Sequence, residues 1–139
     1  MQAQPLPGRS IDIRSFEAGE IDPGDFDHAA HVYIAWCYLQ EHGLLDAIAR
    51  FTTALRALTV RLGAKTKYHE TITWFFLIVI AERCAKTPSA DWPSFRQHNA
   101  DLLRDASILR RSYTAECLQS ELARRQFVLP DLPQNYDCR

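Results

Sequence analysis

The chain has 139 residues, close to the usual size of one domain, which leaves no room for a separate cofactor-binding domain. Apolar residues make up 47% of it and charged residues 24%, so the chain can bury a core. Sixteen Lys and Arg stand against seventeen Asp and Glu, and the net charge of −1 supplies no field for holding a polyphosphate backbone. Composition therefore predicts a small soluble protein and argues against nucleic acid as a partner.

The segment 1–24 is dense in proline and glycine, which excludes a long helix and predicts an extended lead-in. Phe16 and Ile21 can anchor it. The first ten residues contain no apolar run of the kind found in a secretory signal. The sequence therefore favours a cytoplasmic location.

Three long segments with apolar residues at helical spacing follow the lead-in. The expected helices run from a cap at Asp25 or Asp27 to about Glu41, over 44–62, and over 68 to about 85. The third has the most apolar centre, at 72–81, so it should pass through the middle of the fold. That apolar run is too short to span about 30 Å of hydrocarbon, which argues against a membrane partner.

The segments with a helical pattern after residue 86 are shorter. Amphipathic pieces are expected at 92–98 and 102–111, and a last helix or pair of turns at 114–126. The proline-containing tail at 129–139 should be irregular. No strand-like alternation persists. We therefore expect a single all-α domain over 1–139, in which a bundle of three main helices at 25–86 is covered by shorter helices at 87–128.

The four cysteines are far apart in the sequence and form neither a C-x-x-C pair nor a zinc-ribbon pattern. They are Cys37, Cys84, Cys117 and Cys138. Free thiols are therefore expected, with Cys37 and Cys84 buried on apolar helical faces and unpaired.

His28 and His31 are three residues apart at the start of the first expected helix, which puts both imidazoles on one face. His69 stands at the start of the third. If these two helices run parallel, their beginnings meet, and the three rings can converge on one ion while leaving coordination positions open. This spacing predicts a divalent metal, with zinc, iron and copper all suited to imidazole.

A histidine pair at this spacing also occurs without a metal, where the rings cap the helix, pair with an acid or face water. A structural role for the pair, and metal-free acid–base chemistry by the cluster, therefore stay open. His42 and His98 have no partner in the pattern and are expected to be ordinary surface or capping residues.

Other side chains suit a small-molecule site. Glu70 adjoins His69 and is a candidate fourth ligand or base, although a helix dipole also favours an acid in a first turn. Thr73 offers a hydroxyl for catalysis, although threonine there is commonly satisfied by local backbone bonding. The candidate substrate-binding residues are Arg124, for its fork of donors, and Tyr38 and Trp74, for a flat apolar wall. Their plainer roles are a surface salt bridge and core packing.

Three phrases of the sequence together resemble a family of small bacterial proteins of uncharacterised function. They are FDHAAHV at 26–32 followed by AW at 35–36, KYHETIT at 67–73, and SELAR at 120–124 followed by FVLPD at 127–131. The resemblance covers nearly the whole chain and implies no reaction. It does imply that recurring motifs contain His28, His31, His69, Glu70, Thr71, Thr73 and Arg124.

These observations lead to one main functional hypothesis and three rivals. The main one is an enzyme acting on a small molecule at a three-histidine metal site between the first and third helices. The rivals are a metal-free histidine isomerase or lyase, a helical module that binds a hydrophobic or haem-like ligand, and an interaction protein with incidental histidines. The oligomeric state is left open.

Overall fold

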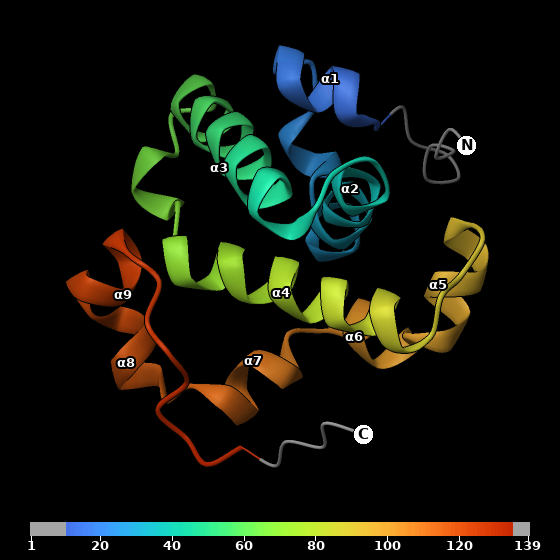
Figure 1. The fold of residues 1–139 in the computed structure, drawn as a ribbon. Helices are drawn as coiled ribbons and strands as arrows, with labels where there is room; N and C mark the ends of the chain where they lie inside the picture. The colour runs from blue at the N-terminus through green and yellow to red at the C-terminus, as the bar shows by residue number, and fades with distance from the viewer. Residues whose placement is uncertain (1–10, 135–139) are drawn as a thin grey trace.

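A computed structural model describes residues 11–134 of the chain. Over these residues the fold is built from helices and contains no strand, as the sequence predicts (Figure 1). The expectations for Met1–Ser10 and for Cys138 lie outside the described residues.

The first helix lies inside the segment expected to be extended. Helix α1 spans Ile13–Ala18 and begins with a capping box, in which Asp12 and Ser15 each accept a hydrogen bond from the other's backbone N–H. It ends at Gly19, whose φ of 71° is the left-handed conformation typical of a helix C-terminus. The density of proline and glycine therefore led to a wrong expectation here, because a six-residue helix fits between these breakers.

The three longest helices have nearly the expected bounds. Helix α2 spans His28–Glu41, α3 spans Leu44–Arg61 and α4 spans Glu70–Lys86. Asp27 caps α2 by accepting a hydrogen bond from the Ala30 N–H, as the sequence suggests. Two short 3₁₀ turns, Pro23–Asp25 and Lys65–Lys67, precede α2 and α4.

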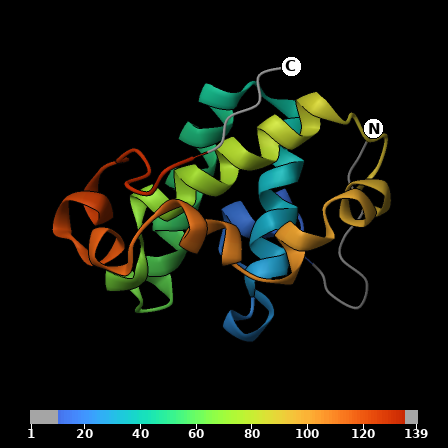
Figure 2. The ribbon, with the colours of Figure 1, turned by 90° about the horizontal axis from the view of Figure 1, so that it is seen from below.

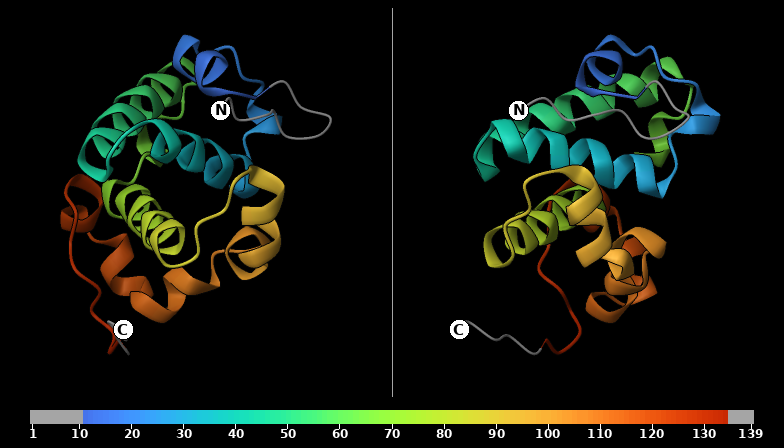
Figure 3. Two further views of the ribbon diagram at one scale, coloured as in Figure 1. Left: turned by 45° about the vertical axis from the view of Figure 1, so that its right-hand side comes forward. Right: turned by 90° about the vertical axis from the view of Figure 1, so that its right-hand side faces the viewer.

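Helix α4 lies in the middle of the molecule. Helices α1, α2 and α3 lie on one of its sides, and the short helices within residues 100–125 lie on the other (Figures 1 and 3). The buried face of α3 repeats every three or four residues, which is the spacing that the sequence predicts. It consists of Ala47, Ile48, Phe51, Thr52, Leu55 and Leu58. Aromatic residues from α1 and α2, including Phe16, Tyr33 and Tyr38, fill the core on this side.

Five short helices follow α4 in the described residues, and they run back along it from its end towards its start (Figure 2). They are α5 (Trp92–His98), α6 (Ala100–Arg104), α7 (Ser107–Ser112), α8 (Ala115–Gln119) and α9 (Glu121–Arg125). The piece expected at 102–111 is therefore broken in two, whereas 114–126 forms two short helices in place of one, close to the pair of turns that the sequence left open. The breaks have local causes, because Asp105 accepts a hydrogen bond from the Ser107 N–H and Ser120 accepts one from the Ala123 N–H.

The irregular segment after α9 is tied to the start of α4. The Thr71 hydroxyl donates to the Gln126 carbonyl at 2.8 Å and accepts from the Val128 N–H at 3.2 Å. The Trp74 ring stacks on Phe127 with centroids 5.4 Å apart. Two of the phrases that carry the family resemblance are thus in direct contact, which gives Thr71 a structural role.

The expectation of free cysteines, with Cys37 and Cys84 buried, is confirmed in part. Cys37, Cys84 and Cys117 are all free, and Cys37 is buried, whereas Cys84 is only half-buried. Burial raises the pKa of Cys37 to about 12. No helix within residues 11–134 is both long enough and apolar enough to cross a membrane.

Candidate functional site: a basic pocket beside the start of α4

The start of α2 lies beside the middle of α4 and not beside its start. His28 packs edge-on against Phe76 with ring centroids 5.2 Å apart, and Phe76 lies seven residues beyond His69. At 1.5 Å per residue, this offset separates the two positions by about 10 Å along the α4 axis. The helices cross obliquely, so their first turns do not meet (Figure 1). The Nε2–H of His28 donates to the Leu102 carbonyl at 2.8 Å instead.

His31 lies between two aromatic rings. Its imidazole stacks on Phe51 at 5.1 Å and on Phe26 at 6.0 Å, and its Nε2 atom is buried without a hydrogen-bond partner in the described part of the chain. Burial, together with the nearby His28, lowers the pKa of His31 to about 4. At neutral pH the ring is therefore uncharged and packs as part of the core.

His69 is the N-cap of α4, and both of its ring nitrogens are engaged. Nδ1 accepts from the Ile72 N–H at 3.2 Å, while the Nε2–H donates to the Leu118 carbonyl at 2.6 Å. A ring bonded in this way has no free lone pair for a metal ion. The imidazole therefore joins α4 to α8.

The convergence of His28, His31 and His69 expected from their spacing does not form in this fold. Over the part of the chain that is described, no group of three or more His, Cys, Asp or Glu side chains is placed to hold a metal ion. The reason is the offset between α2 and α4, together with the hydrogen bonds that His28 and His69 make to separate carbonyls.

Replacing His69 should destabilise the fold. His69→Ala removes the cap of α4 and the bond to α8, at a cost of about 2 kcal/mol in the free energy of unfolding. His69→Asn keeps a side chain that caps helices well but cannot reach Leu118, so it should cost about 1 kcal/mol. Urea titration followed by circular dichroism measures both changes. Wild-type stability in His69→Ala would show that the ring does not join the two helices.

Three further candidate residues make contacts within the fold that indicate structural roles. The Thr73 hydroxyl donates to the carbonyl of His69 at 2.7 Å, which is the local backbone bonding weighed against catalysis. Tyr38 is fully buried and donates to Glu17 at 2.8 Å, on the α1 side of the molecule. Trp74 stacks on the C-terminal segment at Phe127. Tyr38 and Trp74 therefore face different surroundings and do not form one wall.

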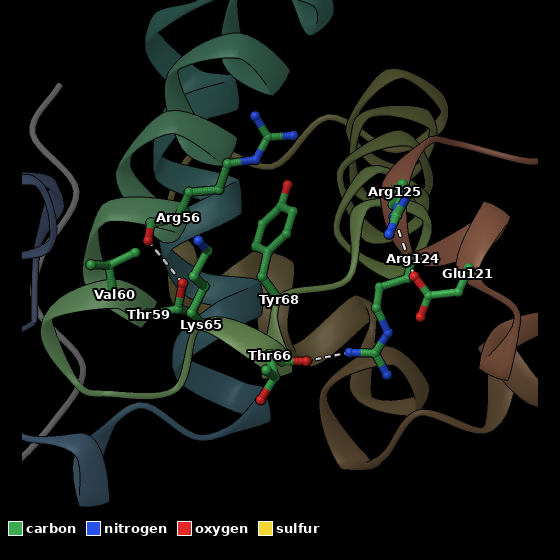
Figure 4. Close-up of a pocket in the computed structure, with 9 residues that line it drawn as sticks. All are labelled: Arg56, Thr59, Val60, Lys65, Thr66, Tyr68, Glu121, Arg124 and Arg125. Atoms are coloured by element: carbon green, nitrogen blue, oxygen red, sulfur yellow. Dashed lines mark hydrogen bonds and ion pairs between the residues drawn. The ribbon is translucent and has the colours of Figure 1, made fainter.

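Arg124, in contrast, lines a pocket. The pocket has a volume of about 1020 Å³ and lies between the C-terminal half of α3, the Lys65–Lys67 turn and α9 (Figure 4). Four cations line it, namely Arg56, Lys65, Arg124 and Arg125. The other lining residues are Thr59, Val60, Thr66, Tyr68 and Glu121.

The loop on one side of the pocket depends on the end of α3. Gly63 has a φ of 66°, which reverses the chain directly after the helix, and the next N–H, of Ala64, donates to the Thr59 carbonyl at 2.8 Å. The Lys65–Lys67 turn begins immediately afterwards. Arg124 reaches across from α9 and donates to the Thr66 carbonyl, which joins the two sides of the pocket (Figure 4).

Glu70 does not line the pocket but contacts two residues that do, and both of its carboxylate oxygens are occupied. It accepts from the Tyr68 hydroxyl on one oxygen, and from Arg56 at 2.8 Å on the other. The Arg56 guanidinium lies over the Tyr68 ring at 5.0 Å from its centroid. Burial and the bond to Glu70 raise the pKa of the Tyr68 hydroxyl. Glu70 thus holds two pocket residues in place, which differs from the roles of metal ligand and base expected for it.

The cations of the pocket differ in how well they are neutralised. Arg56 pairs with Glu70, and Arg125 pairs with Glu121 at 3.2 Å through side chains that are both mostly exposed. Arg124 bonds only a neutral carbonyl, and Lys65 has no ion-pair partner among the described residues. Lys65 and Arg124 therefore leave positive charge at the pocket that the protein does not neutralise.

Comparison with protein-family models, with curated proteins and with solved structures gives no match for this chain. The functional argument therefore depends on the geometry of the pocket.

Proposed function

We propose that this protein binds a small anionic molecule in the pocket between α3, the Lys65–Lys67 turn and α9. The observation that carries the proposal is the gathering of Arg56, Lys65, Arg124 and Arg125 around one concave surface in a chain whose net charge is −1. A concave surface with a few converging polar groups is the usual form of a small-molecule site.

The donors available at the pocket suit a carboxylate or a phosphate. A guanidinium has five N–H donors in a planar fork, and Arg124 uses one nitrogen of this fork on the Thr66 carbonyl. Lys65 adds three donors on an exposed ammonium group. An anion between them gains charge-assisted hydrogen bonds, which are stronger than bonds between neutral groups.

This proposal keeps two expectations from the sequence but puts the binding site in a different part of the fold. A small-molecule partner and the role of Arg124 as a clamp for an anionic group both remain. The site, however, lies at Arg124 and not at His28 and His31. Of the functional hypotheses drawn from the sequence, the proposal is nearest to a ligand-binding helical module, with an anion in place of a haem-like ligand.

The test compares two lysines of the same turn. Lys65→Gln should weaken binding of the probe anions inorganic phosphate and benzoate about tenfold, because it removes a charged donor from the pocket. Lys67→Gln removes the same charge from an exposed residue that does not line the pocket, and it should leave affinity close to wild type. Amide chemical shifts in ¹H–¹⁵N NMR titrations give the affinities and map the site.

Two results would contradict the proposal. One is the absence of shift changes at Lys65, Thr66 and Arg124 with either anion. The other is an equal loss of affinity in Lys65→Gln and Lys67→Gln, which would indicate general charge attraction and no defined site.

A further inference from the structure

The volume of the pocket is too large for an anion alone. At about 1020 Å³, it lies at the upper end of the range of about 300–1,000 Å³ that is typical of pockets for drug-sized organic ligands. An inorganic phosphate or a single carboxylate group would contact Lys65 and Arg124 and leave most of this volume to water. The size therefore indicates a ligand with a body beyond its acid group.

Most of the pocket's lining surface is apolar, although Thr59, Thr66 and Glu121 also line it. Val60 is 58% exposed, although valine is usually buried, and it lines the pocket. The Tyr68 ring stands in the middle of the pocket, with Arg56 and Lys65 on the α3 side and Arg124 and Arg125 on the α9 side (Figure 4).

The arginine side chains add to this apolar surface. Arg56 has its guanidinium on Glu70, and Arg125 has its own on Glu121, so both charged ends already have partners. Their methylene stems remain as apolar surface in the wall of the pocket. The stems of Arg56 and Arg125 thus add hydrocarbon to the wall, whereas Lys65 and Arg124 supply the charge that has no ion-pair partner among the described residues.

We propose that the ligand is an organic acid whose apolar body packs on Val60 and Tyr68 while its carboxylate or phosphate group binds Lys65 and Arg124. This inference rests on the proposed function, and it adds the class of ligand. Each methylene taken out of water contributes about 0.8 kcal/mol, which is about fourfold in affinity. Even a short apolar body therefore makes a measurable difference.

Four probes separate charge from apolar contact in the wild-type protein. They are inorganic phosphate, acetate, 3-phenylpropionate and the neutral 3-phenylpropanol, each titrated by NMR. We expect 3-phenylpropionate to bind at least about tenfold more tightly than acetate or phosphate, because only this anion has a body that reaches Val60 and Tyr68. It should also bind at least about tenfold more tightly than 3-phenylpropanol, which lacks the charge.

A matched pair of variants on α3 tests the wall directly. Val60→Ser should weaken 3-phenylpropionate about fivefold and leave acetate unchanged, because it removes only apolar surface. Leu45→Ser makes a comparable change at the other end of the same helix, where Leu45 is 82% exposed and does not line the pocket, and it should have no effect. Both residues are exposed, so neither change should disturb folding.

The outcomes distinguish the two proposals. If phosphate, acetate and 3-phenylpropionate bind at the pocket with equal affinity, or if Val60→Ser and Leu45→Ser behave alike, the organic-acid inference is wrong and anion binding remains. If 3-phenylpropanol binds as tightly as 3-phenylpropionate, or if no anion binds there, the proposed function is wrong as well.

Discussion

Phe16→Ala is expected to destabilise the protein by about 3–5 kcal/mol, the usual cost of removing a buried phenyl ring. Phe16 is completely buried, although it belongs to a helix of only six residues. Its ring stacks on Phe51 of α3 at 5.2 Å and on Phe26 at 5.5 Å, and packs edge-on against Tyr38 at 6.2 Å. The variant therefore leaves a cavity where α1, α2 and α3 meet.

Urea unfolding of wild type and Phe16→Ala at neutral pH measures this change. Domains of this size are usually stable by about 5–15 kcal/mol, so the variant should lose a large share of its stability and, at the lower end of this range, nearly all of it. Phe127→Ala is the control, because Phe127 is half-buried and stacks on Trp74 alone, and its loss should be smaller. Equal costs for the two variants would show that α1 is not part of the core.

The packing of Phe16 also shows where sequence reasoning failed. The prolines and glycines of 1–24 exclude a long helix, and this part of the reasoning holds over 11–24. A short helix needs only a cap, one buried side chain and a stop. Asp12, Ser15 and Gly19 supply the cap and the stop in the sequence itself, so the spacing from Asp12 to Ser15 was a signal that could have been used.

The long helices could be predicted because local patterns determine them. Apolar spacing gives the buried face of α3, and Asp27 and Gly43 mark the ends of α2 closely. The offset between α2 and α4 could not be predicted in the same way. It depends on how side chains such as Phe76 pack between the two helices, and no local pattern encodes that contact.

The same distinction applies to the candidate site. The sequence suggests Arg124 as an anion clamp because an arginine fork suits an anionic group whatever its surroundings are. Its partner on the other wall, the Thr66 carbonyl, is 58 residues away in the sequence, so only the fold brings Lys65 and Arg124 to one pocket. Glu70 was identified as a functional residue beside a histidine, whereas the fold joins it to Tyr68 and Arg56.

Acidification is expected to destabilise the wild-type protein through His31. Its pKa in the folded state is lowered to about 4, mainly by burial and further by His28, whereas an exposed histidine titrates near its ordinary value of 6.5. Between these two values the unfolded chain binds a proton that the folded chain does not bind. Stability is therefore full above about pH 6.5 and falls as the pH drops towards 4. The loss from this group between pH 7.5 and pH 5 should be about 2 kcal/mol.

His31→Phe should remove this part of the pH dependence. A phenyl ring can keep the stacking between Phe26 and Phe51, and the buried Nε2 atom that it replaces has no hydrogen-bond partner in the described part of the chain. Urea midpoints at pH 7.5 and pH 5 should therefore differ less in the variant than in wild type, and the variant should be the more stable of the two at pH 5. The other ionisable side chains are the same in both proteins, so the difference between the two pH profiles measures the contribution of His31, its interaction with His28 included. Parallel profiles would show that His31 is protonated in the folded state, and its ring would then have to reach water or an acidic partner.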